Sequence, residues 1–311
     1  MGYGEFLLQI KAAVEEAMPQ AQVDMHHVLK NNQVALDGIT ILYEGETISP
    51  TIYLNELYAQ YEDGRSMEEI VRDVLTLYRS SRCQPAFEIG CLKNFEYVRD
   101  RVVFKLINYE ENREMLKEMP HRRILDLAMV FYFILEDEVL GVATALIFNS
   151  HLELWQIDEE TLYKVARENT PRLLGWELQS MDQLIDEMLL REMRPEFESE
   201  EDYEAFCRSM LGRERKPSSP MYVLTNNERF NGAGCMLYQD VLDRFAREQN
   251  SDLYVLPSSI HEVILIPCSQ SPAREELCDM VREINQTEVA VTDRLSDQVY
   301  RYSLDEGILK L

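Results

Sequence analysis

The sequence predicts an α+β protein made of mainly antiparallel sheets with helices packed on them. Hydrophobic residues make up 46% of the 311 residues, which is enough for a sizeable packed core. Strand-length apolar runs occur in pairs joined by short turns, which is typical of antiparallel hairpins. Segments of helical periodicity separate these pairs and indicate helices that cover the sheets.

The first predicted module covers residues 1–85 in the order α-β-β-α-α. Apolar residues at helical spacing predict a helix over 3–18. Strands are expected at Val23–Lys30 and Val34–Tyr43. Asn31-Asn32 suits the tight turn between them, because asparagine tolerates positive φ.

Two further helices complete this module. Ser49-Pro50 supplies an N-cap and a first helical position, and Gly64 is placed to end that helix. Ser66 and Glu69 have the spacing of a capping box, which predicts the start of the last helix.

The second predicted module covers residues 90–194. A strand at Val102–Asn108 precedes a short helix near 112–119. The apolar runs Ile124–Leu135 and Val139–Phe148 predict a buried hairpin.

Two helices follow this hairpin. Asp158 caps the first. The second runs through 181–189, where methionines are typical of core or interface packing. Residues 195–219 contain an acidic run and a stretch rich in Arg, Lys, Pro and Ser, so we interpret them as a linker or exposed insertion.

The third predicted module covers residues 220–311 in the order β-α-β-β-α-β, which is the ferredoxin-like order. Its strands are expected at 221–225, in a hairpin over 253–266 and at 299–303, and Ser271-Pro272 is expected to cap the helix before the last strand. The second module begins with the same order. A diverged internal duplication explains this recurrence, and chance repetition of one supersecondary unit explains it nearly as well.

The charge and the cysteines limit the class of function. A formal net charge of -25 repels phosphates and anionic lipids, so neither nucleic acid nor a membrane is an expected partner. The same field favours solubility, or contact with a basic protein. Six cysteines without a Cys-x-x-Cys pair indicate reduced, mostly buried thiols of a cytoplasmic protein. We expect no secretory signal, because no basic region precedes an apolar run at the N-terminus.

The connection inside the last hairpin is the main candidate binding site. It contains Pro257, Ser258, Ser259, His261 and Glu262. Serine, histidine and glutamate are the residue types of nucleophilic catalysis, but neighbouring strand residues point to opposite faces. A turn in which the serine hydroxyls satisfy backbone groups is the simpler interpretation. We expect a rigid turn at a surface cleft. We interpret it as a binding site in preference to a catalytic site.

Five further residues complete the candidate set. Gly232 and Gly234 lie between a strand and a helix, where they serve tight packing or anion binding. Trp155 is expected in the core or in a binding groove. His121 and Asp126 would join His261 and Glu262 if the protein were a hydrolase with a site between the second and third modules.

No metal or cofactor is expected from the sequence. The five histidines form neither H-x-x-x-H nor H-E-x-x-H. His151-Leu-Glu153 matches half of a zinc deaminase motif, but Ser271 stands where the second cysteine of the other half is required. Neither the P-loop pattern nor the dinucleotide-binding glycine pattern is present.

Several short strings along the chain carry a family resemblance. They are Lys30-Asn-Asn32, Ser49-Pro-Thr-Ile-Tyr53-Leu, Lys105-Leu-Ile-Asn108, Pro120-His121 with Asp126-Leu127, and Pro257-Ser-Ser with His261-Glu262. Together they resemble an uncharacterised bacterial family, a domain of unknown function from anaerobic Gram-positive gut bacteria. The resemblance covers nearly the whole chain and implies a cytosolic bacterial protein without assigning an activity.

Two hypotheses of function follow. The first is a non-catalytic protein-binding or scaffold protein that uses an acidic face or an exposed sheet edge. The second is the hydrolase with His121, Asp126, His261 and Glu262 in one pocket. The geometry of these four side chains discriminates between them. The oligomeric state is left open by the sequence.

Overall fold

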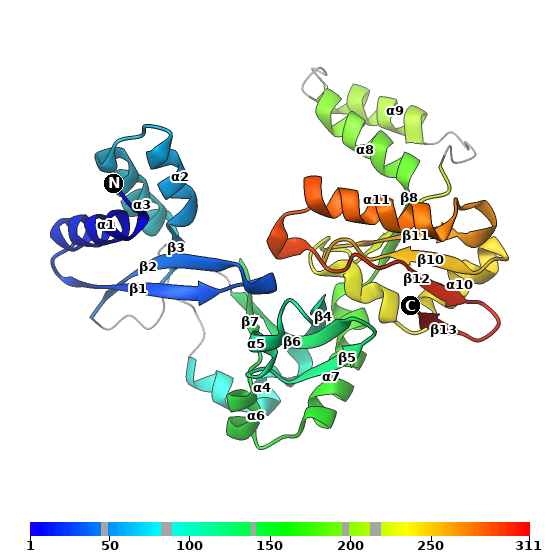
Figure 1. Cartoon of the computed structure of the whole chain (residues 1–311), viewed down its shortest axis with the longest axis horizontal. Helices are drawn as coiled ribbons and strands as arrows, with labels where there is room; N and C mark the ends of the chain where they lie inside the picture. Colours follow the sequence, from blue (N-terminus) through cyan, green and yellow to red (C-terminus); the bar gives the residue numbers. More distant parts are fainter. Residues whose placement is uncertain (45–48, 82–88, 138–140, 195–198, 212–218) are drawn as a thin grey trace.

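The computed structural model describes residues 1–44, 49–81, 89–137, 141–194, 199–211 and 219–311. Their strands form three sheets on which the helices pack (Figure 1). Every strand ladder within the described ranges is antiparallel. The predicted α+β class is therefore confirmed.

The N-terminal sheet has a hydrophobic core of its own. Its strands lie in the order β1-β2-β3. Phe6 and Ile10 of α1 are fully buried in one cluster with Ile39 and Ile41 of β2. The elements of this N-terminal part are α1 (Tyr3–Ala17), β1 (Ala21–Leu29), η1 (Asn31–Gln33), β2 (Ala35–Tyr43), β3 (Ile52–Tyr53), α2 (Asn55–Glu62) and α3 (Met67–Ser81).

Local signals in this part act as the sequence predicts. Asn32 adopts a left-handed φ of 57° in the turn after β1, a conformation that asparagine tolerates. Gly64 follows α2 with a φ of 102°. The Ser66 hydroxyl accepts from the amide of Glu69, whose carboxylate accepts from the amide of Ser66.

Two serine-proline pairs do not cap helices, contrary to the prediction. The Ser49 hydroxyl donates to the carbonyl of Ile41 at 2.8 Å, and the chain pairs with β2 as β3 before α2 begins. The Ser271 hydroxyl donates to the carbonyl of Cys268 at 3.3 Å, and α11 (Arg274–Thr287) starts without a side-chain cap. In both places the hydroxyl serves another local backbone bond.

The second sheet is organised around the long strand β6. β4 pairs with one edge of β6, and β5 and β7 share the other edge in succession. The prediction of one strand over Ile124–Leu135 is wrong, because Leu125 and Asp126 form a turn between β5 and β6. Leu125 adopts a left-handed φ of 57°, a conformation that leucine rarely takes, so the sequence did not reveal this turn. The Val139 start of the next predicted strand lies outside the described residues. The elements here are η2 (Ile89–Lys93), α4 (Phe95–Val98), η3 (Arg99–Arg101), β4 (Val102–Asn108), α5 (Arg113–Leu116), β5 (His121–Ile124), β6 (Leu127–Asp137), β7 (Gly141–Leu146), α6 (Asn149–Trp155) and α7 (Glu159–Leu174).

The third sheet has the strand order β13-β12-β10-β11-β9-β8. Its edge strand β8 (Glu177–Ser180) precedes α8 (Met181–Met193) and α9 (Glu200–Leu211), which lie side by side away from the sheets (Figure 1). The segment that we predicted as a linker or insertion thus lies between two paired strands, β8 and β9. The remaining elements are β9 (Tyr222–Thr225), η5 (Gly232–Leu237), α10 (Val241–Gln249), β10 (Leu253–Leu256), β11 (Val263–Pro267), η6 (Cys268–Gln270), η7 (Val291–Asp293), β12 (Tyr300–Ser303) and β13 (Ile308–Lys310).

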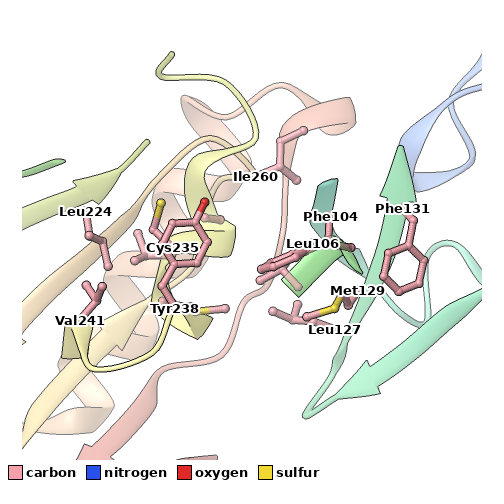
Figure 2. Packing of buried hydrophobic residues seen from close by; sticks show 14 of the residues in the cluster. Phe104, Leu106, Leu127, Met129, Phe131, Leu224, Cys235, Tyr238, Val241 and Ile260 are labelled. Carbon is pink, nitrogen blue, oxygen red and sulfur yellow. The ribbon is translucent and has the colours of Figure 1, made fainter. Parts of the chain in front are cut away.

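The second and third sheets share one hydrophobic core. Figure 2 shows Phe104, Leu106 and Phe131 of the second sheet on one side, and Leu224 and Tyr238 of the third part on the other. Alternate residues of β10 and β11 face this shared core, while those between them pack under α11. The boundary between the second and third modules therefore stays a prediction, since their cores are continuous.

The N-terminal part contacts the rest of the chain through η1. The side-chain amide of Asn32 donates to the carbonyls of Val291 and Arg294, both at 2.7 Å. The side-chain oxygen of Asn32 accepts from Nδ2 of Asn112 at 2.9 Å, and the backbone amide of Asn32 donates to Oδ1 of Asn112 at 2.7 Å. Asn31 adds a bond to the carbonyl of Thr292 at 2.6 Å. One three-residue turn thus makes a dense set of polar contacts to both other parts.

Candidate functional site

The connection between β10 and β11 is packed between two other segments. The backbone amides of Ser296 and Leu295 donate to the carbonyls of Pro257 and Ser258, both at 2.9 Å. On the other side, the hydroxyl of Thr225 donates to the carbonyl of His261 at 2.7 Å. These bonds specify the conformation of the connection.

The His261 ring joins two loops. Its Nδ1 accepts from the backbone amide of Asn231 at 3.2 Å, and its Nε2 lies 3.8 Å from a carboxylate oxygen of Asp293. The hydroxyl of Ser259 accepts from the backbone amide of His261 at 3.0 Å and makes no hydrogen bond to the ring. Ser259 and His261 therefore do not form a nucleophile–base pair in this structure.

The two serines of the connection differ in their contacts, which allows a matched test. Ser259 is 6% exposed and its hydroxyl accepts a hydrogen bond, whereas the Ser258 hydroxyl bonds no residue of the described ranges. We expect Ser259→Ala to lower the free energy of unfolding by about 1 kcal/mol. Ser258→Ala should change it by less than about 0.5 kcal/mol. Urea unfolding of both variants measures the difference, and equal losses would contradict this assignment.

Gly232 and Gly234 permit close packing. A Cβ atom at Gly232 would overlap the Thr225 hydroxyl and lie 2.5 Å from the carbonyl oxygen of His261. A Cβ at Gly234 would lie 3.0 Å from the ring of Phe104. Both glycines are buried in η5. Close packing therefore accounts for both glycines.

Two of the four residues of the hydrolase hypothesis line different cavities. Asp126 lines a cavity of about 590 Å³, and Glu262 lines a different one of about 280 Å³ beside β8. Neither cavity is lined by His121 or His261. Nδ1 of His121 donates to the carbonyl of Met119 at 2.9 Å. The arrangement gives the hydrolase hypothesis no support.

Trp155 is a core residue. It is 7% exposed, and its indole N–H donates to the carbonyl of Leu92 at 2.9 Å. Its ring packs against Phe95 and Phe133 at centroid distances of 5.6 and 6.3 Å. The His151 ring stacks on the Trp155 ring at a centroid distance of 5.3 Å. Burial lowers the pKa of His151, which favours a neutral ring in this packing.

An apolar groove lies on the face of β6 and β7 that points away from the shared core. Its volume is about 370 Å³. Tyr132 forms part of the floor, and burial raises the pKa of its hydroxyl to about 12, so that this hydroxyl is protonated at neutral pH. Opposite charges stand at its edge, on Arg101 and Glu228. The lining residues are Arg101, Tyr132, Ile134, Val142, Thr144, Leu173, Leu174, Glu228 and Phe230.

Three large apolar side chains of this groove are exposed. Val142 is 72% exposed, Phe230 51% and Leu173 39%. They come from β7, from the loop after β9 and from the end of α7. The sequence predicts a buried hairpin at Val142, and no local pattern singles out Leu173 or Phe230. They form one surface because three segments that are distant in the sequence meet there.

In the ranges that the structure describes, no three His, Cys, Asp or Glu side chains are grouped so that they could hold a metal ion. No helix in those ranges has both the length and the apolar composition needed to cross a bilayer.

Comparison with known proteins gives a family without an activity. No curated protein and no solved structure matches the chain. A family model described as a family of unknown function matches residues 3–304. Because this match spans nearly the whole chain, the protein belongs to the family of unknown function DUF5688.

Proposed function

We propose that the chain is a non-catalytic protein-binding protein of the bacterial cytoplasm, and that the apolar groove on β6 and β7 receives an extended segment of its partner. The observation that carries the proposal is the exposure of Val142, Phe230 and Leu173 around one hollow. Grouped apolar side chains on a protein surface mark binding sites, whereas single ones are ordinary.

The strand beside the groove supports an extended partner. β7 pairs with β6 along one edge, and its other edge has no strand partner within the described ranges. Val142 and Thr144 of this strand line the groove. A peptide that adds to such an edge obtains main-chain hydrogen bonds from the strand and places alternate side chains in the neighbouring hollow.

The charge of the chain indicates the character of the partner. Its net charge is -25, and the exposed Glu228 at the groove makes no ion pair with a described residue. A segment with an apolar side chain flanked by lysine or arginine would complement both the apolar groove and the negative charge of the chain.

A displayed library of random decapeptides, selected on the immobilised full chain, tests the proposal. We expect enriched peptides to carry an apolar residue next to basic ones. Val142→Asp should weaken their binding at least about tenfold, since it places a charge in the apolar groove. Fluorescence polarisation with labelled peptides measures the dissociation constants.

Leu8→Asp is the matched control. Leu8 is 71% exposed on α1, almost as much as Val142, but it lies outside the groove. Its substitution should leave peptide affinity unchanged. Enriched peptides that bind Val142→Asp as tightly as the unaltered chain would refute the groove assignment, and a library without any enriched peptide would refute peptide binding.

A further inference from the structure

A second cavity, distinct from the groove, lies where all three parts of the chain meet. Its volume is about 590 Å³, which is within the usual range for small-molecule sites. Asn32 contributes from the N-terminal part, Asp126 from the turn before β6, and Arg294 to Gln298 from the segment before β12. Most of its lining residues have polar or charged side chains. The full set is Asn32, Asn108, Glu110, Glu111, Asp126, Asn285, Gln286, Val291, Arg294, Leu295, Ser296, Asp297, Gln298 and Leu311.

The carboxylate of Asp126 is held in place by two hydroxyl groups. Ser296 donates to one of its oxygens at 2.6 Å and Tyr300 to the other at 2.5 Å. Burial and the negative charge of Asp126 raise the pKa of Tyr300, so the phenol keeps its proton and acts as the donor. Each carboxylate oxygen has a further lone pair. Asp126 is therefore a positioned acceptor with capacity for another donor.

Asn285 adds an unpaired acceptor to the same lining. Its side chain is 2% exposed, and its Nδ2 donates to the carbonyl of Ser296 at 3.0 Å and to Asp297 at 2.6 Å. Its Oδ1 has no hydrogen-bond donor among the described residues. A buried acceptor of this kind is unfavourable unless a donor is supplied.

Arg294 provides the opposite charge. Its Nε donates to the carbonyl of Val289 at 3.1 Å, and its guanidinium forms no ion pair with a carboxylate of the described ranges. The guanidinium fork matches a carboxylate in geometry. Arg294 has an extended backbone, with φ of -63° and ψ of 130°. It lies two positions before Ser296, and both residues line the cavity.

From these groups we infer that the cavity is a binding site for a small zwitterion of the α-amino acid class. The carboxylate of the ligand pairs with Arg294, and its ammonium donates to Asp126. The exposed carboxylates of Glu110 and Glu111 favour entry of the cationic end. Because Asn32 forms part of the wall, a bound ligand also strengthens the contact of the N-terminal part with the rest of the chain.

Thermal unfolding of the full chain with each of the twenty common L-amino acids, added singly at millimolar concentration, tests this inference. We expect at least one of them to raise the melting temperature by about 2–4 °C. The corresponding amine without the carboxylate, and the acid without the ammonium, should each fail to do so. Calorimetric titration of the active amino acid then gives its dissociation constant.

Substitutions separate this site from general effects. Arg294→Met should abolish the shift, and Arg294→Lys, which keeps the charge without the fork, should weaken binding at least about tenfold. Arg282→Met removes an exposed arginine of α11 and should leave binding unchanged. The inference is overturned if no amino acid raises the melting temperature, if the amine alone binds equally well, or if Arg294→Lys binds like the unaltered chain. Peptide binding in the groove is unaffected by any of these outcomes.

Discussion

Phe104→Ala is expected to lower the free energy of unfolding by about 3–5 kcal/mol, the largest loss of any substitution considered for this protein. Phe104 is 2% exposed in the shared core and meets the ring of Tyr238 edge-on at 6.1 Å. It comes from the second sheet, whereas Tyr238 and the neighbouring Gly234 belong to the third part. Removing the Phe104 ring therefore leaves a cavity inside the core, where the two parts pack against each other (Figure 2).

Because this core is continuous, both parts should lose stability together. Urea unfolding followed by tryptophan fluorescence, which reports on Trp155 and Trp176, should shift to a lower midpoint in one step. Phe148→Ala is the control, since that ring is 36% exposed, and it should cost less than about 1 kcal/mol. Two fluorescence transitions, of which only one moves, would show that the second and third parts unfold independently.

Gly232→Ala is expected to cost about 3 kcal/mol, at the upper end of overpacking effects. The added methyl would overlap the Thr225 hydroxyl and lie 2.5 Å from the carbonyl of His261 and 2.7 Å from the amide of Asn226. Two of these neighbours are backbone atoms, which cannot move without breaking the bonds that hold the connection after β10. The substitution should thus displace this connection as well as lower stability.

Gly4→Ala is the matched control for the same chemical change. Nothing lies within 4 Å of a Cβ atom at Gly4, which is inside α1. Alanine is the better helix former, so this variant should gain about 0.5–1 kcal/mol. Thermal and urea unfolding measure both changes. A Gly232→Ala variant as stable as the unaltered chain would mean that the loop after β9 adjusts freely.

The candidate site shows where prediction from the sequence was limited. The sequence located the hairpin of β10 and β11 and the polar residues between its strands. It did not reveal that Leu295 and Ser296, far along the chain, hold this connection by their backbone amides. It placed His261 with Glu262, but His261 bonds Asn231 in the loop after β9, and Glu262 lines a cavity together with residues of β8. No local pattern connects these segments.

The sequence did not predict either of the two proposed binding surfaces, for a similar reason. Val142 belongs to an apolar run, and such a run is compatible with burial on both faces of a sheet. Whether its outer face is covered depends on α7 and on the loop that carries Phe230. The polar cavity combines Asn32, Asp126 and Arg294, and a single asparagine or arginine in a sequence indicates no site.

The fold class and most of the elements follow from patterns in the sequence. The turn at Asn32, the capping box of Ser66 and Glu69, and the Asp158 cap of α7 follow from conformational preferences and hydrogen bonds within a few residues. The folded arrangement was needed to show that the second and third sheets share a core and that Ser49 bonds β2 instead of a helix. It was also needed to show which apolar faces stay exposed. Those outcomes depend on contacts between residues distant in the chain, whose free energies local patterns do not contain.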